Sequence, residues 1–157
     1  MAHEWPQGFE SQFFSPREFK HPELMDPSWI ADLDTLRMRC GFPLKMNSDA
    51  RSPEEHEELY SKEIAKGESY PTESAHLWTE EFAVRAGDVE PSIPRDGDGC
   101  DLNLDEREIK LTGEIVRMHA EGRWPKLGLG IETGHWHIDD TPRLGERRPK
   151  FWVAISR

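Results

Sequence analysis

Apolar residues recur at helical spacing in two long stretches of the chain. The first begins at Asp26 and Pro27, which favour a helix start, and ends at Gly41; its apolar positions are Trp29, Ile30, Leu33, Leu36 and Cys40. The second begins at Asp105, which we expect to cap it, and ends at Gly122; its apolar positions are Ile109, Ile115, Val116 and Met118. Shorter helices are predicted from Ser15–Pro16 and from Ser52–Pro53, the latter running to Gly67.

Strand-like segments lie between and after these helices. They are residues 43–50, 101–104, 127–132 (LGLGIE), 134–140 (GHWHIDD) and a final strand or extended tail at 151–156. Residues 67–100 hold many turn formers and no clear period beyond a short strand or helix near 77–85. The chain begins with helices and continues with strands mixed among helices. This order predicts an α+β fold, with a small antiparallel sheet and the helices packed on one side.

The length and composition indicate one globular domain with a small core. The chain has 157 residues, of which 35% are hydrophobic and 32% charged, while six Trp argue against disorder. We expect a loose arm over residues 1–12 and a single domain over 13–157. Cys40 and Cys100 cannot form a disulfide framework and are predicted to be buried, reduced thiols.

The net charge of -11 disfavours binding to nucleic acid or to an anionic membrane surface, since both are negatively charged and attract positively charged side chains. No apolar run is long enough to span a membrane. The first residues have neither a basic nor an apolar segment, so we predict no signal peptide and a cytoplasmic location on synthesis.

The densest group of reactive side chains is HWHIDD. His135 and His137 lie two apart and point to one face of a strand, with Asp139 in phase with both, where it can orient an imidazole. Asp140 should face away. Two imidazoles side by side suit a metal ion, although surface histidines at a strand end give the same pattern.

Two more segments strengthen the metal interpretation. His76 ends a Ser-Ala-His loop, and Asp101 enters an apolar strand, where a carboxylate needs a partner or a metal. With His137 they give three nitrogen and oxygen ligands and leave a fourth position for water, as in catalytic zinc sites. Asp88 is the competing ligand. Asp96 and Asp98 lie close enough to be confused with Asp101 or to bind calcium, but a full calcium loop is missing.

Short motifs follow in an order that resembles the zinc D-alanyl-D-alanine carboxypeptidase family. That family includes phage endolysins and cell-wall peptidases and shares its fold with the Hedgehog signalling domain. The motifs, which cover about residues 13–152, are FFSPREF, LDTLRMRCGFPLKM, SDARSPEEH, SAH, DGCDL, WHID and TPRLGERRPKFW.

The resemblance implies roles for individual residues. His76, Asp101 and His137 match the zinc ligands, and Arg51 matches an arginine that binds the substrate's carboxylate or carbonyl. Its alternative role is structural. Ser74 resembles a serine that binds substrate or supports the first ligand, and His135 a histidine that stabilises the oxyanion, although an exposed strand histidine is the alternative.

Two departures from the family pattern stand out. His76 and Asp101 are further apart than the family's first two ligands, so we interpret residues 77–98 as an insertion, such as a lid or substrate-binding loop. Gly134 occupies the position of the family's catalytic carboxylate. Glu132, the nearest carboxylate before His137, is therefore our choice for the general base.

The resemblance implies a monomeric zinc peptidase that hydrolyses peptidoglycan stem peptides. It would act as a carboxypeptidase or an endopeptidase, and on the cell wall if released as a phage lytic enzyme. The alternative is a non-catalytic structural or binding protein, such as a phage virion component, that keeps the fold; Gly134 favours this alternative.

Overall fold

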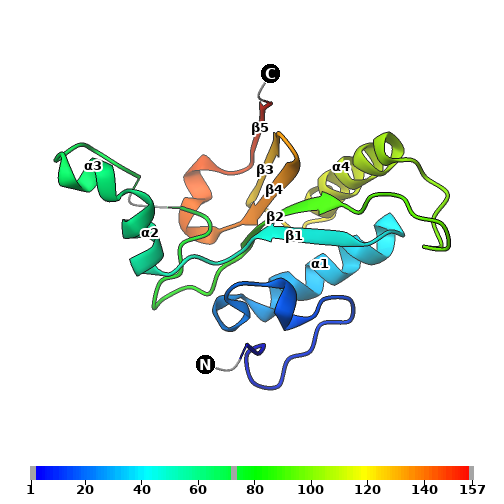
Figure 1. The fold of residues 1–157 in the computed structure, drawn as a ribbon, viewed down its shortest axis with the longest axis horizontal. Helices are drawn as coiled ribbons and strands as arrows, with labels where there is room; N and C mark the ends of the chain where they lie inside the picture. The colour runs from blue at the N-terminus through cyan, green and yellow to red at the C-terminus, as the bar shows by residue number, and fades with distance from the viewer. Residues whose placement is uncertain (1–2, 72–73, 156–157) are drawn as a thin grey trace.

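A five-stranded sheet organises the chain, whose structure is a computed structural model describing residues 3–71 and 74–155 (Figure 1). The strand order is β1-β2-β4-β3-β5. The strands are β1 (Leu44–Ser48), β2 (Ala86–Pro91), β3 (Leu127–Glu132), β4 (His135–Asp140) and β5 (Lys150–Ala154). The helices are α1 (Pro27–Cys40), α2 (Pro53–Leu59), α3 (Ser61–Ala65) and α4 (Leu104–Ala120), with 3-10 turns η1 (Pro16–Glu18), η2 (Pro22–Leu24) and η3 (Pro142–Arg147).

The α+β class is confirmed, and the small sheet that was expected to be antiparallel is mixed. β1–β2, β2–β4 and β3–β4 are antiparallel, whereas β3 and β5 are parallel. The reason is the connection after β4. The chain passes through η3 and returns to the far side of β3, so β5 enters the sheet in the same direction as β3.

The two long helices begin and end at residues with clear capping roles. Asp26 accepts a hydrogen bond from the Ser28 amide at the start of α1, and Gly41 ends that helix with φ 79°. Asn103, rather than the predicted Asp105, caps α4, because its side chain and that of Glu106 bond each other's backbone amides.

The predicted helix over 53–67 is divided into α2 and α3. The break is at Tyr60, whose φ of -106° and ψ of 21° are not helical. Figure 1 shows both pieces beside the sheet, away from the layer that α1 and α4 form. Of the three helices expected to cover the sheet, α1 and α4 do so, and the segment over 53–67 does not.

The core lies between α1, α4 and one face of the sheet. Trp29 of α1 packs so closely on Gly87 of β2 that a Cβ there would lie 2.9 Å from the indole. Trp136 of β4 donates a hydrogen bond from Nε1 to Thr112 Oγ1 of α4 (2.8 Å). Because side chains alternate across a strand, His135, His137 and Asp139 face the opposite side.

Three segments differ from their sequence-based expectations. Residues 86–91, inside the interval interpreted as an insertion, form β2, a strand with a neighbour on each side, rather than a lid or loop. The strand predicted at 101–104 is absent there, because Asn103 and Leu104 begin α4. In the N-terminal arm Trp5 packs edge-on against Phe9 and Phe19, so this part is not loose. Residue 156 of the predicted last strand, like residues 1–2 of the arm, lies outside the described residues.

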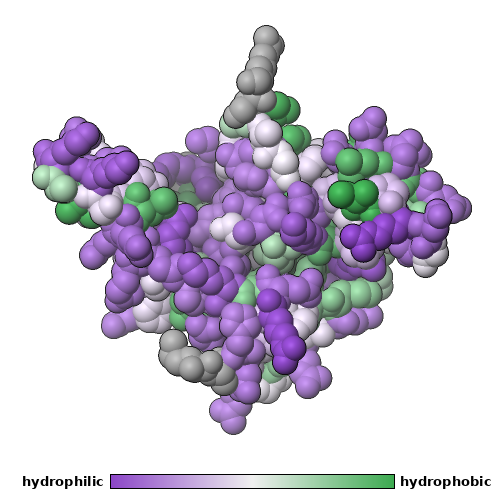
Figure 2. All heavy atoms as spheres, in the orientation of Figure 1, coloured by the Kyte–Doolittle hydropathy of each residue, from purple (hydrophilic) through white to green (hydrophobic). Residues whose placement is uncertain are grey.

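The surface in Figure 2 is mostly hydrophilic, with small apolar groups, one of them over α4. Among the described residues, no helix combines the length and the apolar character needed to cross a membrane.

Candidate metal centre

Strand β4 presents polar side chains to the open face of the sheet. His135, His137 and Asp139 alternate with the apolar Trp136 and Ile138, which confirms that the two histidines share a face. The neighbouring strand β2 places Asp88 directly opposite His137. An acidic side chain from the centre of the sheet therefore faces the histidine pair.

His76 reaches the same place from a loop that the backbone of Arg51 holds. The Arg51 amide donates to the His76 carbonyl (2.7 Å), and the Trp78 amide donates to the Arg51 carbonyl (2.9 Å). The imidazole Nδ1 of His76 bonds the Asp49 carbonyl at 2.7 Å. Main-chain and side-chain bonds thus fix both the loop and the ring.

Three potential ligand atoms converge in this cluster, which we call the His137 cluster (His76, Asp88 and His137). His137 Nδ1 lies 2.9 Å from Asp88 Oδ1 and 3.2 Å from His76 Nε2. His76 Nε2 lies 3.4 Å from Asp88 Oδ1. As whole residues the two histidines are only 6% and 8% exposed, so water hydrates their polar atoms little.

In each imidazole, the nitrogen that points away from the cluster faces an acceptor, and this determines whether the other nitrogen carries a hydrogen. A carbonyl oxygen only accepts, so His76 Nδ1 carries the hydrogen and its Nε2 offers a lone pair in the neutral ring. His137 Nε2 faces Asp139 Oδ2 at 2.7 Å, which likewise leaves a lone pair on Nδ1. If both rings are neutral, they and Asp88 direct three lone pairs at one another; a proton on His137 Nδ1, which then donates to Asp88, or a metal cation satisfies this arrangement.

The pKa values of His137 and Asp88 are shifted in the directions that favour a positive charge within the cluster. Burial lowers the pKa of His137, but hydrogen bonds to Asp139 and Asp88 outweigh it and raise that pKa to about 9. Burial raises the pKa of Asp88, and its hydrogen bonds to His137 and His76 outweigh this and hold it well below the ordinary value. The cluster stabilises positive charge at its centre.

Two glycines of β3 make room for the supports of the cluster. A Cβ on Gly128 would lie 2.4 Å from Asp139 Oδ2, so the glycine admits Asp139 and the Arg148 guanidinium that binds it at 2.8 and 2.9 Å. A Cβ on Gly130 would lie 2.4 Å from the Trp152 indole. That indole lies beside His137, with ring centroids 5.3 Å apart.

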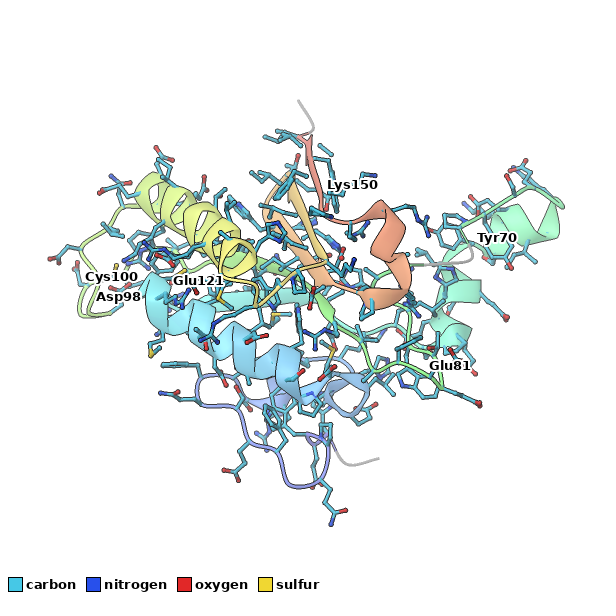
Figure 3. All side chains as sticks on the ribbon, turned by 180° about the vertical axis from the view of Figure 1, so that it is seen from behind. Tyr70, Glu81, Asp98, Cys100, Glu121 and Lys150 are labelled. Atoms are coloured by element: carbon cyan, nitrogen blue, oxygen red, sulfur yellow. The ribbon has the colours of Figure 1, made fainter. Side chains whose placement is uncertain are left out.

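Asp101 does not belong to this centre, which corrects the predicted ligand set. It is exposed, and it is in neither of the two groups of potential metal ligands among the residues the structure describes. Figure 3 shows its neighbours Asp98 and Cys100 at one end of the molecule, far from Tyr70 and Glu81, which flank the His76 segment in sequence. The physical reason is that Asp101 lies in the turn leading into α4 and not in a strand of the sheet.

Asp88 takes the place that the sequence assigned to Asp101. A signal for it was present, since Asp88 follows His76 more closely than Asp101 does, and the resemblance implies that the first two ligands lie close together in sequence. The missing information was that this segment, with a glycine and a proline, forms a central strand.

Glu132 and His135 lie together at the edge of the centre. They face each other across the β3–β4 pair, and His135 Nε2 bonds Glu132 Oε2 at 2.9 Å. His135 Nε2 is also 3.8 Å from Asp88 Oδ2. The predicted base and the predicted oxyanion-stabilising histidine are therefore neighbours of the His137 cluster.

Arg51 and Ser74 flank the His76 side of the centre. Arg51 is half-buried, donates to His56 Nδ1 (3.0 Å) and lines an open groove of about 490 Å³ together with Asp49. Ser74 Oγ accepts a hydrogen bond from the His76 amide (3.3 Å), so it supports the loop that carries the first histidine. A substrate-binding role for either residue stays a prediction.

Comparisons of the chain with protein-family models, with curated proteins and with solved structures found no match. The resemblance to the zinc carboxypeptidase family therefore remains a prediction from short motifs, and the chemistry of the centre has to be argued from its own geometry.

Proposed function

We propose that this chain is a zinc-dependent peptidase with the Hedgehog/DD-peptidase fold, and that it hydrolyses peptide bonds in peptidoglycan stem peptides. The observation that carries the proposal is the convergence of potential ligand atoms from His76, Asp88 and His137. The substrate class comes from the motif resemblance alone.

The donor set fits zinc. Two imidazole nitrogens and one carboxylate oxygen, each ring held from behind by an acceptor, are the ligands of catalytic zinc sites that keep a fourth position open. Zinc bound there would supply Lewis acidity and a water of lowered pKa. Asp49 and Asp139 would hold the rings in the ligating orientation.

The chain's own residues would do the remaining work. Glu132 has an oxygen within 4.8 Å of an Asp88 oxygen, so it can accept a proton from a water at the centre. His135, bonded to Glu132, would donate a hydrogen bond to the developing oxyanion. Arg51 would bind a substrate carboxylate with its planar guanidinium.

Zinc binding to matched variants tests the centre. We expect Asp88→Ala to lose zinc in elemental analysis after dialysis, whereas Asp101→Ala, an exposed acid that the sequence favoured, keeps it. Retention of zinc by Asp88→Ala would contradict the ligand set.

Digestion of purified peptidoglycan, followed by mass analysis of the fragments, tests the activity. Release of D-alanine or cleavage within the stem peptide would support a peptidase. Zinc binding without any product would instead favour the non-catalytic binding protein.

A further inference from the structure

Asp88 has two carboxylate oxygens, and they face different partners. Oδ1 lies against His137 and His76, as described above, while Oδ2 lies 3.8 Å from His135 Nε2. His135 Nε2 in turn lies 2.9 Å from Glu132 Oε2. Asp88, Glu132 and His135 thus form a second group whose ligand atoms are all within 4.8 Å of one another.

The sheet register produces this adjacency. Asp88 is opposite His137, and His135 is the next residue on the same face of β4, opposite Glu132 of β3. The Asp88 carboxylate of β2 therefore belongs to two neighbouring groups of potential ligands. A carboxylate shared in this way is the usual bridge in two-metal sites, where the ions lie ~3.5–4 Å apart.

We propose that Asp88, Glu132 and His135 form a second, weaker divalent-cation site that shares Asp88 with the zinc centre. The inference rests on the proposed function, because the shared ligand belongs to that centre. One imidazole and two carboxylates suit Zn²⁺ or Mn²⁺.

The second site is weaker for two physical reasons. Its side chains are more exposed, 33% for Glu132 and 29% for His135 against 8% for His76 and 11% for His137. The ligating nitrogen of His135 also already bonds Glu132, so a cation has to displace this hydrogen bond. In both sites a cation has to displace such a bond, since His137 Nδ1 bonds Asp88 at 2.9 Å, but the His137 cluster offers two imidazoles and the second site only one.

Occupation of the second site would regulate the first. Glu132 cannot accept a proton while it ligates a cation, so metal in excess of the tight site would lower turnover. The same carboxylate is the base at low free metal and a ligand at high free metal.

Counting bound ions tests the proposal without any activity measurement. The full chain is equilibrated with rising free Zn²⁺, and bound zinc is measured by elemental analysis. We expect the bound ratio to pass from one ion per chain to two, and Glu132→Gln and His135→Ala each to stop at one. Glu90→Gln is the matched control, since Glu90 lies on the same face of β2 but pairs with Lys45 (3.3 Å), and it should still reach two.

The outcomes separate the two proposals. A wild-type chain that saturates at one ion, which His137→Ala then loses, would overturn the second site and leave the zinc centre intact. Two ions in the wild type and also in Glu132→Gln and His135→Ala would overturn it as well. A wild-type chain that binds no zinc would contradict the proposed function itself.

Discussion

Two buried polar clusters in this small protein solve the same problem in opposite ways. The Arg107 cluster (Arg107, Ser92 and Asp98) surrounds a guanidinium of 0% exposure with acceptors at 2.8–3.3 Å, from the Asp98 carboxylate, the Ser92 hydroxyl and the carbonyls of Leu102, Ser92 and Cys100. In the His137 cluster two imidazoles and a carboxylate face one another, with no fixed cation such as a guanidinium among the three side chains.

The difference separates a cluster that is complete within the chain from one that can take up a metal ion. In the Arg107 cluster the chain supplies both the cation and its acceptors, so nothing further is needed. In the His137 cluster the chain supplies ligands and supports, and the positive charge among them is exchangeable: a proton on His137 or a bound metal ion. The following predictions test that distinction, from the largest effect to the smallest.

Glu132→Gln should abolish most of the chemistry and leave the tight zinc ion in place. Loss of a general base costs ~10²–10⁴-fold in rate, because the amide cannot take the proton. Turnover of a peptidoglycan-derived peptide at one bound zinc per chain measures this, with Glu90→Gln as the control. Turnover equal to that of the wild type would exclude Glu132 as the base.

Arg107→Met should destabilise the fold, because it leaves three carbonyls without their donor, and a buried acceptor left unpaired costs ~1–3 kcal/mol. Urea denaturation of the metal-free chain measures the change. Zinc affinity should stay at the wild-type value, since the Arg107 cluster has no part in the centre. Loss of zinc by the folded variant would contradict the independence of the two clusters.

Asp139→Asn should weaken zinc binding by ~10–100-fold, because the amide no longer holds the His137 ring as a carboxylate does. Competition with a chelator gives the affinity. Asp98→Asn is the matched control, since it changes the acidic partner of the other cluster in the same way. Equal affinities in both variants would show that Asp139 does not support the ring.

The two cysteines should react with iodoacetamide at different rates. Burial, aided by the charge of Glu114, raises the pKa of Cys40 to about 12, so its thiol stays protonated and unreactive at pH 8. Cys100 is half-buried, and its backbone belongs to the loop around Arg107. Mass spectrometry should find Cys100 modified first, and Arg107→Met should accelerate only that reaction. Faster labelling of Cys40 would contradict its burial.

The sequence predicted the locally determined parts of the fold. α1 and its Gly41 end, and the β3–β4 pair, follow from periodicity, capping and turn residues that lie next to one another in the chain. His76, His137 and Asp139, which the structure brings together, were also singled out from short segments. Each of these inferences needed only a short window of residues.

The parts that failed depend on distant contacts. β2 is a strand because β1 and β4 pair with its two edges, and its own residues, with a glycine and a proline, carry little strand preference. Asp88 was therefore only the competing ligand. Asp101 was favoured because Leu102 and Leu104 follow it, but those leucines lead into a helix.

The position of Trp152 gives the centre an optical reporter of its own. The indole lies beside the His137 ring and over the bare backbone of Gly130, so a paramagnetic ion such as Co²⁺ at the centre would quench its fluorescence. The chain has six Trp, and a Trp152→Phe variant would isolate this component of the emission. Occupancy of the centre can then be followed in time by light alone, before any substrate is known.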